Sequence, residues 1–446
     1  MNPNRHRLRW GWHLFALLAI FYFSPYTRLS SETGPAEKSA SIYYHFGGLV
    51  SVWEILLLAA IALLVLKSLQ RGELQLHFGP WLGPFALMLL IAGAFIVGLL
   101  HSSAGPLSYG LTETKRPLIA FAAPLYMFSI YLIAINSIQH RGQLFQILRW
   151  LDWLTFGLCV YGVLRLVLLI SGEAAGMWFF GLPIVLYDQM LMLYVPTFTI
   201  CALSLRRQSL GWRRWAMLFV MLFFILTSTR RFNYILLAAG IILLVGLGLK
   251  IKLWRPRRLL RPLFVAAVSL GMLAVIVAVL APKFMSGVET SIQTLNVLSR
   301  VGQKHGGEMR LAEVKNLFAN LNERPYAYLT GFGLGTLWRA LEPQPVDPLT
   351  RRLRLKHDWY TQFHLPYLAM IFRLGIIGSL LFCLWLLGYA FMTISRLRML
   401  RRSLQPAALA MLAFLILTLP AIIDSFNPTS WTLCGLYAAL LEKLPD

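Results

Sequence analysis

The chain has 446 residues, of which 58% are hydrophobic and only 13% are charged. A soluble domain carries about 25% charged residues on average, so this composition excludes an ordinary soluble protein. The net charge of +23 would suggest a nucleic-acid partner for a soluble protein. Here the basic residues lie mostly in short loops between apolar segments, so we expect no nucleic acid partner.

Apolar stretches of about 20 residues recur along the chain, and each is long enough to cross the hydrocarbon core of a bilayer. They predict an all-α polytopic membrane protein with about 12 transmembrane helices and one long, partly helical loop before the last three. The first apolar run lacks a cleavage site and is expected to stay as a helix. Asp188 and Pro196 point to a break within the sixth span. The expected helices cover residues 10–27, 47–66, 80–100, 117–137, 150–171, 182–205, 214–229, 232–250, 261–281, 365–392, 405–423 and 428–441.

The distribution of basic residues predicts the orientation. If the N-terminus is cytoplasmic, the cytoplasmic segments hold 22 lysines and arginines, whereas the short loops on the other side hold 6. Such an excess marks the cytoplasmic side, so both termini are expected there. The chain then divides into helices one to nine (1–281), an outer loop (282–364), and the last three helices with a short cytoplasmic tail (365–446).

The outer loop is expected to contain a helix over residues 307–323. Within this segment Leu311, Val314, Leu317, Phe318 and Leu321 recur at helical spacing on one face, and Pro325 ends the run. A loop of this length in a compact protein is usually functional. We expect it to fold back over the mouth of the bundle.

Polar residues gather at the predicted outer ends of the helices. Each of them can have either an ordinary structural role or a role in binding or catalysis. An arginine pair at a helix end can contact lipid phosphates, or it can bind a specific anionic ligand, because guanidinium binds phosphate in a bidentate manner. A loop arginine can be a solvated charge, and a histidine that opens an apolar helix can be a satisfied interfacial group. The candidates are Thr227–Arg231, Arg310, the run Gly331–Gly335, and the histidines His357 and His364.

Several signatures are absent from the sequence. There is no Asp-x-Asp, no Walker A sequence and no Gly-x-Ser-x-Gly. The four cysteines lie in apolar spans without CxxC spacing, and no histidine and glutamate cluster has metal-ligand spacing. The glycine run lacks the context of a dinucleotide fingerprint and favours a turn that re-enters the membrane. We therefore expect no cofactor and no metal.

Taken in order, these features resemble the O-antigen ligase and polysaccharide polymerase superfamily of bacterial membrane glycosyltransferases. Members carry a Thr-x-Ser-Arg-like motif, here Thr227-Ser228-Thr229-Arg230, then a loop arginine and Gly-x-Gly-x-Gly, here Arg310 and Gly331–Gly335. They also carry His-Asn-x-Tyr/Phe-Leu before Gly-Ile-Ile-Gly. His364–Leu368 and Gly375–Gly378 keep this spacing, with Leu365 in place of the usual asparagine. His357, followed by Asp358 and with Tyr360 at the third position after it, is the competing histidine.

The resemblance implies a site and a mechanism. The donor would be a glycan on undecaprenyl diphosphate, presented at the periplasmic face of the bacterial inner membrane. Arg230 and Arg310 would bind the diphosphate, with Arg231 and Arg116 as weaker candidates and Arg339 and Tyr367 as candidates by location. His364 would act as the general base on the acceptor hydroxyl, since imidazole titrates near neutral pH. The reaction would need no metal and would invert the anomeric centre.

The sequence leaves the partners and the exact activity open. A polymerase would extend a lipid-linked repeat for a surface polysaccharide, exopolysaccharide or O-antigen, and we favour this reading. A ligase would transfer the glycan to lipid A-core, the lipopolysaccharide acceptor. Two alternative functions belong to other classes of protein. The chain could be a flippase for lipid-linked glycans or a secondary transporter, or it could be a membrane scaffold. Other polysaccharide-assembly proteins are possible partners.

Overall fold

The described part of the chain is all-α, as predicted, apart from three short antiparallel strand pairs. β1 (His45–Phe46) pairs with β2 (Val50–Ser51), β3 (Met177–Phe179) pairs with β4 (Leu182–Ile184), and β5 (Trp338–Arg339) pairs with β6 (Trp359–Tyr360). The computed structural model describes residues 16–21, 45–46, 50–70, 77–80, 83–103, 111–138, 141–170, 177–179, 182–184, 186, 190–206, 210–227, 231–254, 308–341, 359–360, 366–400, 402–423 and 428–444.

Most predicted spans correspond to helices in the structure. The sixth is interrupted, as Asp188 and Pro196 indicated: β4 is followed by the 3-10 helix η2 (Met190–Leu193) and then by α6 (Tyr194–Leu205). The ninth predicted span, 261–281, lies outside the described residues. The other helices are α2 (Val52–Gln70), α3 (Pro84–Ser103), α4 (Leu111–Ser137), α5 (Arg141–Ile170), α7 (Trp212–Thr227), α8 (Arg231–Lys250), α12 (Glu308–Glu323), α13 (Ala327–Thr330), α15 (Pro366–Leu397), α16 (Gln405–Ile422) and α17 (Pro428–Lys443).

Six helices in the described part of the chain are long and apolar enough to cross a membrane. They are α3, α4, α5, α8, α15 and α16, and α2 and α6 contribute shorter apolar stretches. The chain is therefore a multi-span membrane protein. The predicted number of about 12 helices stays a prediction, because the described residues do not cover every candidate span.

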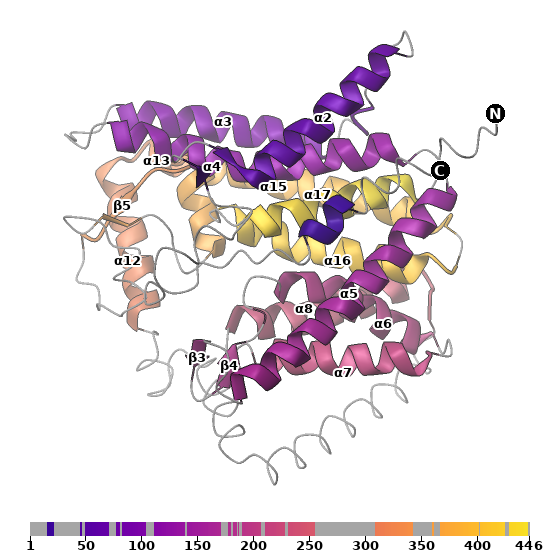
Figure 1. Ribbon diagram of the computed structural model, residues 1–446. Coiled ribbons are helices and arrows are strands. Elements are labelled where there is room, and N and C mark those ends of the chain that lie inside the picture. Colours follow the sequence, from indigo (N-terminus) through magenta and orange to yellow (C-terminus); the bar gives the residue numbers. More distant parts are fainter. Residues whose placement is uncertain are drawn as a thin grey trace.

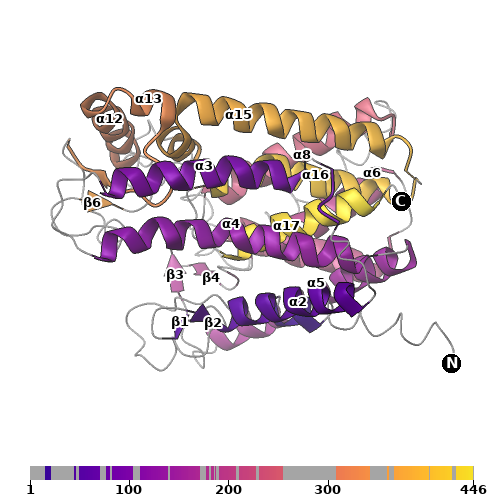
Figure 2. The same ribbon diagram turned by 90° about the horizontal axis from the view of Figure 1, so that it is seen from above.

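The helices pack in two groups on either side of α16. One group contains α2, α3, α4, α15 and α17, and the other contains α5, α6, α7 and α8 (Figure 1). α16 contacts α6 and α8 as well as α15 and α17, and most of its side chains are buried. In both views α3, α4 and α15 lie alongside one another (Figures 1 and 2). α16 is apolar on all sides, and a helix of this kind belongs in the centre of a bundle.

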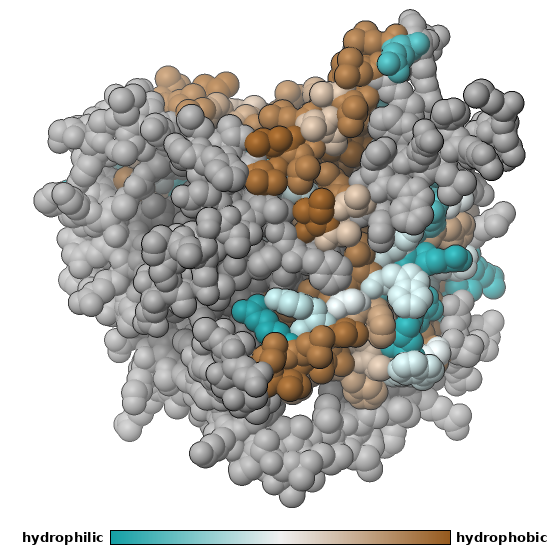
Figure 3. Space-filling view, viewed as in Figure 1, coloured by the Kyte–Doolittle hydropathy of each residue, from teal (hydrophilic) through white to brown (hydrophobic). Residues whose placement is uncertain are grey.

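The outer faces of the helices carry apolar side chains. Figure 3 shows hydrophobic residues covering the side of α2 that faces the viewer. Side chains such as Ile55, Leu58 and Leu66 of α2 and Leu384, Leu387 and Phe391 of α15 are exposed. Exposed apolar surface on this scale fits contact with lipid tails.

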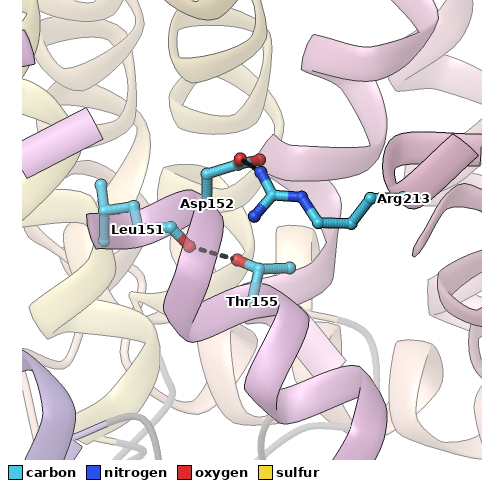
Figure 4. A network of polar contacts seen from close by, with 4 residues as sticks. All are labelled: Leu151, Asp152, Thr155 and Arg213. Atoms are coloured by element: carbon cyan, nitrogen blue, oxygen red, sulfur yellow. Dashed lines mark hydrogen bonds and ion pairs between the residues drawn. The ribbon is translucent and has the colours of Figure 1, made fainter. Parts of the chain in front are cut away.

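Charged groups inside the bundle have polar partners. Tyr126 donates a hydrogen bond to Glu54, and Tyr131 donates one to the buried Glu442. Arg213 of α7 pairs with Asp152 of α5 (Figure 4). The guanidinium of Arg213 also lies 4.2 Å from the centre of the Trp153 ring. Such pairing offsets the cost of placing charge at membrane depth.

Candidate functional site

The loop helix predicted over 307–323 is α12, and it lies across one end of the bundle. In Figure 1 its axis runs across the direction of α3 and α15, and in Figure 2 it is seen close to end-on. Its C-terminal end leads into α13 beside α3, so its N-terminal end points toward the group that contains α8. Pro325 follows closely after its last residue, as expected for a helix end.

The buried face of α12 differs from the predicted face. Leu317 and Leu321 are fully buried, but Leu311 and Phe318 are 45% and 48% exposed. The buried side carries polar residues instead, namely Glu313, Asn316 and Asn320. Hydrophobic spacing alone placed the face incorrectly, because it gives no sign that a polar residue such as Asn320 is buried against β5.

A small apolar cluster docks α12 on the start of α15. Leu317 and Leu321 of α12 pack with Phe332, Trp338 and residues of α15. The rings of Phe332 and Phe372 stack with centroids 4.5 Å apart. We call this set, Leu317, Leu321, Ala327, Phe332, Trp338, Ala369 and Phe372, the docking cluster. Burial of the leucine and phenylalanine side chains in this set, at about 1.5–3 kcal/mol each, helps to hold α12 in place.

Asn320 joins α12 to β5. Its amide oxygen accepts a hydrogen bond from the backbone nitrogen of Arg339 at 3.0 Å, and its amide nitrogen donates to the carbonyl oxygen of Arg339 at 2.7 Å. The buried side chain thus satisfies both backbone groups of one strand residue, as buried polar groups require. The side chain of Arg339 is exposed.

Residues 331–336 form a strap between α3 and α15, which we call the glycine strap. Phe332 and Gly333 donate backbone hydrogen bonds of 2.7 and 3.0 Å to the carbonyls of Phe372 and Arg373. Those carbonyls lie just before the kink at Gly375, where φ is 65° and the helical ladder is interrupted. The strap therefore satisfies backbone acceptors that the kink removes from the helix.

The other side of the glycine strap rests on α3. Leu334 donates a backbone hydrogen bond of 3.0 Å to the carbonyl of Ala94. A Cβ on Gly333 would lie 2.0 Å from the nitrogen of Gly98, and a Cβ on Gly98 would lie 2.3 Å from the oxygen of Leu334. Gly333 also has a φ of 85°, which other residues rarely adopt. Backbone contact between the strap and α3 thus explains why residues 333 and 98 are glycines.

Arg373 fixes the end of the strap. This side chain is fully buried and donates to both the carbonyl oxygen and the hydroxyl of Thr336, the latter at 2.9 Å. From the sequence, Arg373 is an ionisable residue inside an apolar span without an obvious partner, and its contact with Thr336 comes only from the structure. Its burial and its hydrogen bonds give it a structural role.

Arg310 lies in the first turn of α12, and of the two arginines predicted to hold the diphosphate it is the one whose side chain the structure describes. The side chain is 26% exposed, and its Nη1 lies 3.9 Å from Oε2 of Glu313. The Arg310 side chain is therefore mostly buried on a helix that is docked against the bundle, and its exposed part is open to a ligand. The amide and guanidinium groups at this end of α12 favour a negatively charged ligand.

The other predicted site residues lie outside the described side chains. Arg230 falls between α7 and α8, and His364 falls between β6 and α15. His357 precedes β6, whose Trp359 and Tyr360 pair with β5. Arg231 begins α8 and Arg116 lies in α4, but their side chains are outside the described set. Tyr367 is partly exposed at the start of α15.

One polar cluster at this end of the bundle was not predicted. Nδ1 of His101, near the end of α3, lies 3.0 Å from the carbonyl of Val97, and its Nε2 lies 3.2 Å from the hydroxyl of Tyr326. A carbonyl only accepts, so Nδ1 carries the proton and Tyr326 donates to Nε2. The two rings also stack at 5.6 Å.

Comparison with known proteins identifies the region around these features. Residues 215–383 match a family model described as O-antigen ligase. The match begins inside α7 and ends inside α15, so it contains Arg230, Arg310, the glycine strap and both candidate histidines. No curated protein matches the chain. The match supports the resemblance of residues 215–383 to the O-antigen ligase and polysaccharide polymerase superfamily that the motifs predicted.

Proposed function

We propose that the protein is a membrane glycosyltransferase that moves a glycan from undecaprenyl diphosphate to an acceptor hydroxyl. The observation that carries this proposal is the placement of Arg310. It lies at the start of a helix that crosses one end of the bundle, inside the region that matches the O-antigen ligase family. A cationic side chain at the edge of a lipid-facing bundle suits a donor with an apolar tail and an anionic head.

The proposed reaction is a single displacement at the anomeric carbon. His364 removes the proton from the acceptor hydroxyl as its oxygen attacks that carbon. The bond from the anomeric carbon to the diphosphate oxygen breaks, and undecaprenyl diphosphate leaves with the electron pair. Arg230 and Arg310 stabilise the charge that develops on the leaving group, which is the usual role of preorganised donors in transfer reactions. Two guanidinium groups supply this stabilisation without a metal ion.

The proposed setting is the inner membrane of a bacterium, with both termini in the cytoplasm and the α12 end of the bundle in the periplasm. The excess of basic residues in the predicted cytoplasmic segments supports this orientation. α12 then lies at the leaflet where a lipid-linked glycan is presented after it has crossed the membrane. Tags at either terminus should accordingly be accessible only from the cytoplasmic side.

We favour a polymerase over a ligase for the acceptor step. The test uses purified protein and a labelled undecaprenyl-diphosphate repeat unit with no second acceptor, and the products are separated on a gel. A ladder of products supports a polymerase. Transfer that occurs only after lipid A-core is added supports a ligase. No product under either condition with the cognate glycan contradicts the enzyme proposal and favours transport of the lipid-linked glycan.

The site assignment has its own test. Arg230→Ala, Arg310→Ala and His364→Ala are each expected to abolish transfer while the protein still inserts in the membrane. His357→Ala is the comparison, and it should retain activity. Full activity of a well-expressed His364→Ala variant would contradict the assignment of His364 as the base. His357 would then be the candidate to test.

A further inference from the structure

Glu313 is a buried carboxylate in a helix that lies outside the membrane-spanning helices. Its side chain is 1% exposed, and glutamate is almost never buried to this extent unless it is paired. Arg310, one turn earlier on α12, supplies a paired cation, with 3.9 Å between Nη1 and Oε2. This distance is within ion-pair range and beyond a normal hydrogen bond, so charge governs the contact.

The rest of the polar stripe on α12 has a different use. Asn320 holds the backbone of β5, and Asn316 donates to the carbonyl of Ala312 within the helix at 2.9 Å. The docking cluster holds the second half of α12 on α15. These contacts fix the helix through residues beyond Glu313, and Glu313 forms its ion pair with Arg310 in the first half of the helix.

We propose that Glu313 is a positioning residue that holds the guanidinium of Arg310 in place before an anionic donor binds. This inference rests on the proposed function, in which Arg310 binds the diphosphate. A free arginine side chain loses rotamer entropy when it is fixed. A buried negative charge one turn away restricts it beforehand, so less binding energy is lost when the diphosphate arrives.

The experiment compares Glu313→Gln with Glu323→Gln. Both changes replace a carboxylate by an amide on the same helix, but Glu323 is exposed. The readouts are kcat/KM for the lipid-linked donor and the inhibition constant of undecaprenyl diphosphate, the leaving group. Glu313→Gln should lower kcat/KM by about tenfold and weaken inhibition by a similar factor, as expected for one lost charge contact. Glu323→Gln should match the unaltered protein.

The inhibition constant separates positioning from a purely structural role. A variant that folds less well has fewer active molecules, which lowers the rate but leaves the inhibition constant unchanged. An unchanged inhibition constant in Glu313→Gln would therefore overturn the inference. If that variant does not accumulate, Glu313→Asp replaces it, since it keeps the charge and shifts it by one methylene. Glu313→Asp should then weaken inhibition, and unchanged inhibition would again overturn the inference.

Arg310→Lys distinguishes the inference from the proposed function on which it rests. In the Arg310→Lys protein, Glu313→Gln should have a smaller effect than in the unaltered protein, because the group that it positions is gone. Equal effects in both backgrounds would overturn the positioning role. Full activity of Arg310→Ala would instead overturn the proposed role of Arg310. Loss of activity in Arg310→Ala together with normal kinetics in Glu313→Gln would overturn the inference alone.

Discussion

Gly98→Ala tests the contact between the glycine strap and α3. The new Cβ would lie 2.3 Å from the carbonyl oxygen of Leu334 and 3.0 Å from its nitrogen. Carbon and oxygen atoms in weak contact lie about 3.3–3.6 Å apart, so the strap must move by about 1 Å. Both close atoms belong to the backbone, so no side-chain rotation can relieve the overlap.

The displacement removes the hydrogen bond from the Leu334 nitrogen to the Ala94 carbonyl, which is 3.0 Å long. A net hydrogen bond contributes about 1 kcal/mol, and a buried group left unpaired costs about 1–3 kcal/mol, which gives about 2–4 kcal/mol in total. Gly93→Ala is the control on the same helix. Its Cβ would have no neighbour within 4 Å, so the change should stabilise the helix by about 0.5–1 kcal/mol.

The assay is unfolding by sodium dodecyl sulfate in mixed micelles, with the two variants measured side by side. Gly98→Ala should unfold at a lower detergent fraction than the unaltered protein, and Gly93→Ala at an equal or higher one. Trypsin cleavage at Arg339, which lies exposed just after the strap, should also become faster in Gly98→Ala only. Equal unfolding and equal cleavage of both variants would refute the close contact between strap and helix.

Three further substitutions probe buried polar contacts, each by the same unfolding assay. Arg373→Leu should destabilise the protein by about 2–6 kcal/mol, because the carbonyl oxygen and the hydroxyl of Thr336 both lose their buried donor, at about 1–3 kcal/mol each. Tyr131→Phe should cost about 1–3 kcal/mol, because the buried carboxyl group of Glu442 loses its phenol donor. Arg213→Ala should cost no more than about 1 kcal/mol, since its ion pair with α5 is partly open to solvent. The reverse order of these effects would contradict the reasoning from burial.

The sequence was sufficient for features that depend on local pattern. Apolar runs predicted most of the described helices, and Asp188 and Pro196 predicted the interruption before α6. Helical spacing and Pro325 predicted α12 to within a residue. These predictions succeed because span length and helix termination are set by neighbouring residues.

Features that depend on distant partners could not be predicted. Gly98 reads as an ordinary glycine in an apolar helix, yet the glycine strap touches its backbone. The buried face of α12 was placed incorrectly for the same reason, since Asn320 is buried by its contact with β5. Family motifs located Arg310, but its neighbours came from the structure.

The hydrogen bonds of the glycine strap also determine how firmly α12 is attached. The backbone nitrogens of Phe332, Gly333 and Leu334 donate to carbonyls of α15 and α3, which are both helices of the bundle. Opening this segment therefore requires the separation of helices rather than the local fluctuation of a loop. Amide hydrogens here should exchange with solvent as slowly as those of the neighbouring spans. Arg310 is thus carried on an element whose rigidity is that of the membrane-embedded bundle.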